Sequence, residues 1–577
     1  MRATGEANLK APVLTGLLIG LLLGFIDTYG YAVTGYTTAE LSPIVSSILA
    51  LFLLKLMLKR RPTLLEHFVG AIIASGIALS TTITSGMYIT YTMLSTVGSP
   101  KELGLPSWLY FREGSPLTHY GLSLYLYATA VSAAGIIIAY AFHKHFIERE
   151  KLSYPIGIAL TMMLQLTRVL RRASVLIPLL AGMSLQLGVM ILNAPSIDVT
   201  PALQKVLPGS SVALSLDVFV FLLALLIPLN TSIGVGLGNV ATFLLVTPVL
   251  AAEGLLAVLP TMSSGDLAVA AAPLTASAIV GYLLVVSCHY IASVRSAFKA
   301  TLRYLIVSKY VARYVLVSLL VMVSVLAPLL LLTGGVPLRF LVAMPAYVVL
   351  QLFLTLLTIR VAGETGTTSQ ATLPLATFTL YMANVRGALP YVLMDPYTGV
   401  PMPQFMAGVS MNIIKGGRSS GLNAETAAFL LGLSTLVGAP ITLLYGHLLL
   451  TAFGLNSPRL NLLRWLPIVT WMKTIYLGEV GSFNLHAIAL GLTLALAMLL
   501  LTKALRLGGI SLYAIMIGMT LTPDVGLLFL IAAVIKYVAL RIGIEVYEAL
   551  LVYTSLTLAG AGVGVGISVA MSLAGVI

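Results

Sequence analysis

The chain is 577 residues long, 59% hydrophobic and only 9% charged, with a mean hydropathy of +1.03. A soluble domain carries about 25% charged residues, so this composition excludes a water-soluble globular protein. Apolar runs of about 18 residues or more, the length that crosses a hydrocarbon core of about 30 Å, recur along the chain. They are too long and continuous for the alternating strands of an outer-membrane barrel. The sequence therefore predicts an all-α polytopic membrane protein.

The net charge of +13 is concentrated in short clusters of Lys and Arg between apolar runs. The clusters lie within 55–61, 144–151, 168–172, 299–313 and 415–418. Short loops rich in Lys and Arg are typical of the cytoplasmic side of a membrane protein. We therefore expect contacts with anionic lipids of the cell (plasma) membrane and no nucleic-acid partner.

In chain order, the apolar runs predict about 14 transmembrane helices, within a range of about 12 to 16. They lie near 12–30, 41–58, 66–94, 121–142, 174–193, 212–229, 232–252, 269–294, 314–333, 339–360, 424–454, 484–506, 509–534 and 546–575. Three further segments, 154–166, 372–384 and 403–413, are too short to cross alone. We expect short re-entrant segments there, because an irregular or incomplete crossing is tolerated where protein or a cavity surrounds it.

The basic stretch 295–313 is predicted to be a cytoplasmic connector between an N-terminal transmembrane half, 1–294, and a C-terminal half, 314–577. One similarity favours a two-half internal repeat. Residues 34–43 and 365–374 align without a gap and share a Thr-Gly pair, a second Thr and a distal Pro. So short a match also arises by chance, and both interpretations stay open. Polar interruptions at corresponding places in two halves indicate the binding site of a transporter.

Acidic residues within or beside apolar runs are few, and a charge at membrane depth costs about 2.5 to 3.5 kcal/mol unless it is paired or hydrated. Glu364 is the leading candidate, because it lies in a Gly-Glu-Thr-Gly break directly after a span. A carboxyl that gains and loses a proton could couple a proton gradient to transport. The alternative is a helix-end ion pair with Arg360. Glu66 is the second candidate, although a carboxylate at the start of a span also suits the helix dipole.

Other polar residues would line the same pathway. In the two broken segments, five residues would contact the substrate or free the backbone: Thr365, Gly366, Thr367, Tyr36 and Thr37. Asp27 on the first span would line a cavity, or else lie at the membrane interface. Asn412 and Lys415 begin a glycine-rich loop that could meet an anionic group, although topology explains its cations equally well.

Signals of an enzyme are weak. The alternating glycines of 234–238 and 560–566 lie in apolar runs, where they indicate close helix packing and not a dinucleotide site. The seven histidines are scattered, Cys288 stands alone, and the sequence has neither a Walker nor a zincin motif. We therefore expect no enzymatic activity, no metal site and no cofactor other than a proton as the coupling ion.

Several of these segments resemble the motifs of one family. Gly363-Glu364-Thr365-Gly366 is similar to Gly-Glu-Thr-Gly-Ile-Asn-Pro, with Thr368 and Ser369 in place of Asn-Pro. Tyr154-Pro155-Ile156-Gly157 resembles Tyr-Pro-Glu-Gly, with Ile156 in place of Glu. Glu66 matches the first residue of a Glu-Asn-Asn motif, and Lys415-Gly416-Gly417 resembles a degenerate Asp-Leu-Lys-Thr-Gly. These motifs belong to the oligopeptide transporter superfamily, which includes the yellow stripe-like metal-chelate transporters, and the chain resembles a divergent prokaryotic member.

The resemblance implies a proton-coupled symporter that imports short oligopeptides or metal-chelate complexes by alternating access. Glu364 would be the leading proton or substrate carboxylate, with Glu66 second. The expected partners are a small-molecule or peptide substrate and membrane lipids, and a homodimer is left open. Two alternatives remain: a membrane-embedded enzyme that acts on lipid-linked substrates, and a channel.

Overall fold

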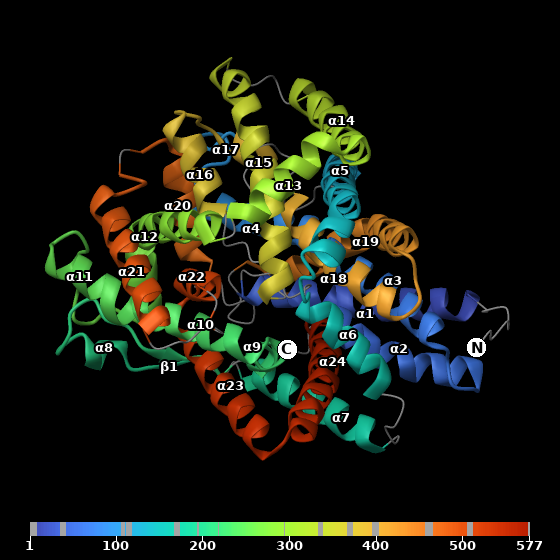
Figure 1. Cartoon of the computed structure of the whole chain (residues 1–577). Helices are drawn as coiled ribbons and strands as arrows, with labels where there is room; N and C mark the ends of the chain where they lie inside the picture. The colour runs from blue at the N-terminus through green and yellow to red at the C-terminus, as the bar shows by residue number, and fades with distance from the viewer. Residues whose placement is uncertain are drawn as a thin grey trace.

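The computed structural model of the chain is helical almost throughout (Figure 1). It describes residues 9–34, 42–105, 110, 118–166, 173–192, 196–216, 218–293, 295–332, 338–365, 373–394, 403–455, 465–479, 481–504, 510 and 512–574. In this part of the chain the β-structure is one antiparallel pair, β1 (Ile197–Asp198) and β2 (Ala213–Leu214). The predicted all-α class is confirmed.

The helices before the predicted connector include two π-helical turns. They are α1 (Lys10–Thr34), α2 (Ser42–Leu58), α3 (Leu64–Ile83), α4 (Ser85–Val97), α5 (Thr118–His143), η2 (Lys144–Arg149), α6 (Pro155–Leu166), α7 (Ala173–Leu192), α8 (Thr200–Leu203), α9 (Val218–Leu226), α10 (Leu229–Ala241), η4 (Thr242–Val246), α11 (Thr247–Ala252) and α12 (Ser264–Ser293).

The connector and the second half are helical as well. Their helices are α13 (Arg295–Val307), α14 (Lys309–Leu332), α15 (Leu338–Thr365), α16 (Leu373–Met382), α17 (Ala388–Met394), α18 (Pro403–Ser419), α19 (Ala424–Phe453), α20 (Leu466–Leu477), α21 (Leu485–Ala504), α22 (Leu512–Thr520), α23 (Pro523–Ile542) and α24 (Ile544–Leu573).

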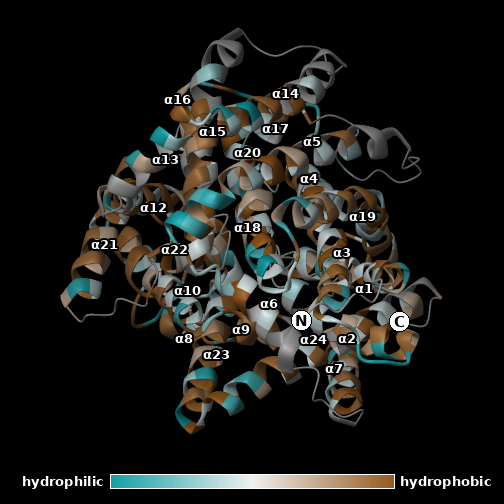
Figure 2. Cartoon of the chain, turned by 45° about the vertical axis from the view of Figure 1, so that its right-hand side comes forward, coloured by the Kyte–Doolittle hydropathy of each residue, from teal (hydrophilic) through white to brown (hydrophobic). Residues whose placement is uncertain are grey.

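Ten helical stretches among the described residues are long and apolar enough to cross a membrane. The predicted spans 41–58 and 339–360 hold shorter apolar helices, Val45–Leu58 and Val349–Gly363. Hydrophobic residues, in brown, run along many of the helices (Figure 2), and large apolar side chains of α7, α19 and α23 are exposed. Such a surface suits lipid and not water. The chain is therefore a multi-pass membrane protein, whereas the number of about 14 crossings remains a prediction.

Three predicted segments are corrected. The run 509–534 is not one helix, because α22 ends at Thr520 and α23 begins at Pro523. The run 212–229 is divided between β2 and the nine-residue helix α9. Segment 403–413 is part of α18, which is 17 residues long. Proline explains the first correction, because it lacks the N–H that a continuous helix needs.

Helix α3 and helix α4, separated by Thr84, form the centre of the first half, and the apolar window that they share is wholly buried. Helices α1, α2 and α19 pack around α3. Elements from the two predicted halves interleave elsewhere, since α7 packs against α24, α12 against α21, and α10 against α22 and α23. In Figure 1 the group α9, α10, α22 and α23 lies on the opposite side of the molecule from α5 and α14.

Candidate functional site

Much of the predicted pathway falls outside the described residues. The structure does not describe four of the predicted site residues, Tyr36, Thr37, Gly366 and Thr367. Most positions of the proposed repeat also lie outside the described residues. Glu364 and Thr365 form the last turn of α15, but their side chains are not described. The roles of these residues in transport therefore remain predictions.

The surroundings of Glu364 are described in part. Gly363 is helical, which corrects the expectation that it interrupts the helix. Its carbonyl oxygen accepts hydrogen bonds from the backbone N of Tyr154 and from Oγ of Ser153, both at 2.9 Å. These donors satisfy an acceptor that the end of a helix leaves without an intrahelical partner. Glu364 thus follows directly on the contact between the end of α15 and the start of α6.

Arg360, the alternative partner of Glu364, pairs with a different carboxylate. Its Nη1 donates to Glu150, which follows η2. The other oxygen of Glu150 lies 2.9 Å from Nε2 of His145. Neutralisation of Arg360 therefore does not require Glu364.

Glu66 forms the capping box of α3. Its Oε2 accepts from the backbone N of Thr63 at 2.9 Å, and its backbone N donates to Oγ1 of Thr63 at 3.1 Å. Arg60 binds both carboxylate oxygens, at 2.9 and 2.6 Å. A bidentate ion pair and a capping box are sufficient reason for a carboxylate here, so the geometry gives Glu66 a structural role.

Asn412 and Lys415 do not lie in a loop, as the sequence indicated, but in the buried helix α18. Oδ1 of Asn412 accepts from the backbone N of Gly157, at 3.2 Å, in the first turn of α6. A Cβ at Gly157 would lie 2.3 Å from the carbonyl oxygen of Asn412, and one at Gly416 would lie 3.2 Å from the ring of Phe68. The glycines therefore serve close packing of α18 against α6 and α3, and do not end the helix.

Asp27 is buried on α1, and Oγ of Ser42 donates to its Oδ2 at 2.5 Å. The cavity beside it has a volume of only about 10 Å³, and apart from Asp27 and Ser42 it is lined by apolar side chains. One water needs about that volume. Asp27 thus lines a cavity, as predicted, but one too small for a peptide or a chelate.

A different polar site lies where two interrupted helices cross. The first interruption separates α9 from α10 at Ile227 and Pro228. In a continuous helix the carbonyl of Ala224 would accept from the N–H of residue 228, which proline lacks. Oγ of Ser232 instead donates to Ala224 O at 3.1 Å.

Lys536 of α23 completes this interruption. Its side chain is fully buried. Nζ lies 2.8 Å from Ala224 O, 2.6 Å from Ile227 O and 2.5 Å from Oγ of Ser232. The three donors of an ammonium thus face three oxygens, two of which belong to backbone that the helix break leaves without a partner.

The second interruption separates α22 from α23 at Leu521 and Thr522. Asn239 of α10 caps it, because its Nδ2 donates to Leu521 O at 2.9 Å and to Thr522 O at 3.2 Å. The same nitrogen lies 3.4 Å from Gly518 O. Each interrupted helix therefore supplies the side chain that caps the interruption of the other. We call the arrangement the crossed helix breaks, formed by residues 224–232 and 518–524 with Asn239 and Lys536.

Small residues bring the two helices into contact. A Cβ at Gly238 would lie 1.7 Å from Ile515 O, and one at Gly518 would lie 1.8 Å from Val235 O. A Cβ at Gly526 would lie 2.0 Å from the side chain of Asn239. The close packing predicted for the glycines of 234–238 is thus confirmed, and so is that of 560–566, where Gly560 touches α7.

The sequence contains two signals for this site, its prolines and its lone lysine. Pro228 and Pro523 each follow an apolar segment that was read as part of a span, and Lys536 is the lone basic residue inside the apolar run 523–540. Proline in an apolar run and a charge at membrane depth are both rare enough to mark a special position.

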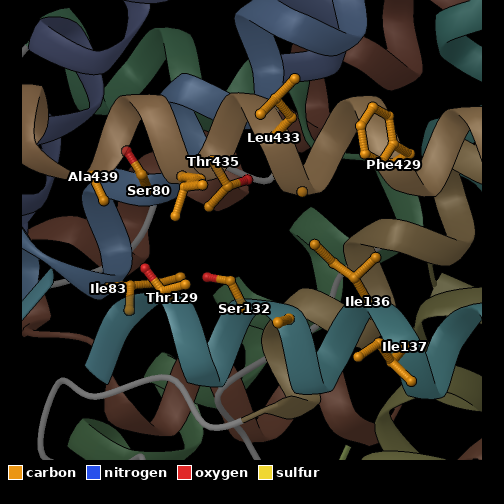
Figure 3. Close-up of a pocket in the computed structure, with 13 residues that line it drawn as sticks. Ser80, Ile83, Thr129, Ser132, Ile136, Ile137, Phe429, Leu433, Thr435 and Ala439 are labelled. Carbon is orange, nitrogen blue, oxygen red and sulfur yellow. The ribbon is translucent and has the colours of Figure 1, made fainter. Parts of the chain in front are cut away.

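The structure also has a cavity of about 320 Å³ between α3, α5 and α19 (Figure 3). Its lining is mainly apolar, with Thr129 and Ser132 on the side of α5, and Oγ1 of Thr129 donates to Tyr125 O of its own helix at 2.8 Å. Oγ of Ser132 is buried and has no hydrogen-bond partner among the described residues. Phe429 and Leu433 on its rim are exposed on the lipid-facing surface. The cavity therefore suits an apolar group better than a charged peptide or chelate.

Comparison with known proteins adds no relative. The chain matches no protein-family model and no curated protein sequence. Within the described residues, no three His, Cys, Asp or Glu side chains come together as they would to hold a metal ion.

Proposed function

We propose that the chain is a secondary active transporter that works by alternating access and uses protons as the coupling ion. The observation that carries this proposal is the crossed helix breaks, in which α9–α10 and α22–α23 are interrupted and each is capped by a side chain of the other. Interrupted membrane helices are tolerated only inside protein or around a water-filled cavity. They are typical of the substrate and ion sites of transporters, near the middle of the membrane.

An irregular backbone also gives a site that can change shape. The caps are single hydrogen-bonding side chains, Asn239 and Lys536, and few bonds need to exchange when the interruptions move. Gly238 and Gly518 bring the backbones of α10 and α22 into direct contact. Packed interfaces of this kind adopt discrete arrangements, as alternating access requires.

The substrate class follows from the resemblance. We propose that the chain is a divergent prokaryotic member of the oligopeptide transporter superfamily, located in the cell membrane, which imports short oligopeptides or metal-chelate complexes. Glu364 is the proposed proton or substrate carboxylate, because it ends α15 where that helix meets α6. Whether the chain forms a homodimer stays open, and the mass of the purified protein in solution would decide it.

Uptake into proteoliposomes tests the function. Purified protein is reconstituted, and uptake of labelled tripeptides and of a labelled iron chelate is measured with and without an inward proton gradient. We expect saturable uptake of one class, at least several-fold faster with the gradient, and abolished by a proton ionophore. Empty liposomes are the control. Uptake that rises linearly with concentration and ignores the gradient would indicate a channel, and chemical conversion of the substrate would indicate an enzyme.

A further inference from the structure

We propose that Lys536 is a proton-binding group of the transporter. As an ammonium, Lys536 holds the α9–α10 interruption closed. When it loses its proton to water, the neutral amine lets the interruption open. The inference deepens the proposed function, because it names the site at which a proton changes the conformation. It stands on geometry that involves neither Glu364 nor the substrate. Lys536, Ala224, Ile227 and Ser232 are all described residues, and the bonds given above are the side-chain hydrogen bonds of Lys536 and Ser232.

The oxygen set around Nζ is that of a cation site. Two backbone carbonyls and one hydroxyl converge on the nitrogen, with no carboxylate among the described partners. Carbonyl oxygens at the end of a helix bear partial negative charge, so they favour a cation. In transporters, unwound carbonyls and helix ends of this kind coordinate the coupling ion. Here the chain places its own ammonium in that position.

Loss of the proton would change the contacts of all three oxygens. An ammonium has three N–H donors, one for each acceptor. A neutral amine keeps two N–H groups and directs a lone pair toward the third oxygen. Because Pro228 has no N–H to donate to Ala224 O, the buried carbonyl of Ala224 would lose part of its hydrogen bonding. If the segment 224–232 then opened toward water, water would supply the missing hydrogen bond.

A buried charge is also costly to keep without a counter-ion. Helices α9 and α10 and strand β2, which pack against α23, carry no titratable side chain among the described residues. Asp217, which precedes α9, lies outside them. On α23 itself, Asp524 lies 12 positions away, or about 18 Å along the helix axis. No carboxylate that the structure describes forms an ion pair with Lys536.

The remaining titratable groups near α23 lie toward its ends or on neighbouring helices. Tyr537 and Arg541 are exposed and bond to one another. The other groups belong to α24 and α12: Glu545, Tyr547, Glu548 and Tyr553, and Asp266, Tyr282, Cys288 and His289. None of them bonds to Nζ of Lys536. Within the part of the chain that the structure describes, the ammonium is therefore stabilised by carbonyl and hydroxyl dipoles, an arrangement that the loss of one proton can reverse.

The competing interpretation is a permanent cap, in which Lys536 stays charged and only stabilises the fold. The two interpretations differ in their dependence on pH. A permanent cap leaves the interruption equally closed at every pH, whereas a proton-binding group opens it as the pH rises. Since the difference concerns local opening, it can be measured without knowledge of the substrate.

Hydrogen exchange by mass spectrometry in lipid nanodiscs makes this measurement. Peptides that cover 224–233 are followed at pH 6, 7.5 and 9, and each rate is divided by the intrinsic rate at that pH. We expect the corrected exchange to rise about tenfold per pH unit until the lysine is neutral, as its deprotonated fraction does. Peptides of α19 report on global opening and should not change.

Three variants test whether the proton of Lys536 is the cause of the pH response. Lys536→Met removes the donors, so the segment should exchange fast at every pH. Lys536→Arg cannot lose its charge, so the segment should stay protected at pH 9. Lys503→Met, which changes an exposed lysine of α21, should keep the wild-type pH response. If Lys536→Met fails to fold, the wild-type and Lys536→Arg profiles still decide.

A corrected exchange rate of the wild type that is the same at pH 6 and pH 9 would overturn the proposal and leave a permanent cap. A pH response that persists in Lys536→Arg would overturn it too, since another group would then be responsible. Neither result depends on uptake. Failure of the transport assay would therefore count against the proposed function while this measurement still gives its own answer.

Discussion

Asn239 and Lys536 each cap a helix interruption that belongs to the other's segment. Asn239, on α10, donates to the carbonyls of Leu521 and Thr522, which follow α22. Lys536, on α23, donates to Ala224 O in α9 and to Ile227 O, directly after α9. The two side chains therefore couple the interruptions, since a shift of α10 relative to α23 changes both sets of bonds. A coupled pair of this kind would serve as the two-state element of the alternating access proposed above.

Asn239→Leu should destabilise the protein by about 1–3 kcal/mol, because it leaves the buried carbonyl of Leu521 without its donor, whereas Thr522 O keeps the backbone N–H groups of Val525 and Gly526. Thermal unfolding in detergent measures the loss. Asn423→Ala is the matched control, since Asn423 caps α19 at the surface with one bond, where water replaces the side chain. An equal effect of the two substitutions would contradict the proposed role of Asn239.

Gly238→Ala should force α10 and α22 apart, because the new Cβ would lie 1.7 Å from Ile515 O. Overpacking of this kind costs about 1–3 kcal/mol or more. Gly188→Ala, in α7, is the control, since a Cβ there has no atom within 4 Å. Alanine favours a helix over glycine by about 1 kcal/mol, so the control should be neutral or stabilising. Comparison of the two melting temperatures checks the prediction.

Glu66→Gln should weaken the protein modestly and leave substrate uptake intact. Gln can still accept from the backbone of Thr63, whereas the charged bonds to Arg60 are lost. Arg60 is half exposed and can turn to water, so the loss should be about 1 kcal/mol or less. Glu66→Ala, which removes the capping box as well, should be less stable than Glu66→Gln. Loss of gradient-driven uptake at unchanged stability would restore the predicted role of Glu66 in transport.

Sequence predicts the class of this fold well because hydrophobic length is a local property. The runs near α7, α12 and α19 are long and apolar, and each is a helix of the expected place and length. Interruptions are harder to predict. Pro228 lies between Ile227 and Leu229, so a hydropathy profile continues smoothly through a point where the backbone does not.

The candidate site was missed for a related reason. The acceptors of Lys536 lie between 304 and 312 residues earlier in the chain. Nothing in the sequence near Lys536 indicates them, and a lone lysine near the end of a span also fits an amine that reaches the membrane surface. At Gly416 and Gly417 the sequence predicts a break where the helix is continuous. A pair of glycines predicts a loop, but here it lets α18 approach Phe68.

Asp198 should make stability depend on pH at the hairpin outside the spans. Burial disfavours its charge, but bonds from the backbone N of Ser264 at 2.7 Å and of Thr200 at 2.9 Å outweigh it, so the pKa of Asp198 is lowered. A lowered pKa in the folded state stabilises the protein above the ordinary value of 3.8. The contribution should be lost as the pH falls below that value. Melting temperatures of the wild type and Asp198→Asn should differ at pH 6 and converge below pH 3.8.

Glu364→Gln should abolish uptake driven by a proton gradient while it preserves exchange of labelled for unlabelled substrate at equal pH. Gln resembles the protonated carboxyl, so it binds substrate but cannot release a proton. The two bonds that Gly363 O accepts from Tyr154 and Ser153 do not involve this carboxyl and should remain in the variant. Glu102→Gln, in an exposed loop, is the matched control and should transport normally. Normal gradient-driven uptake by Glu364→Gln would remove this residue from the mechanism, and a pH response at Lys536 would then identify the remaining coupling site.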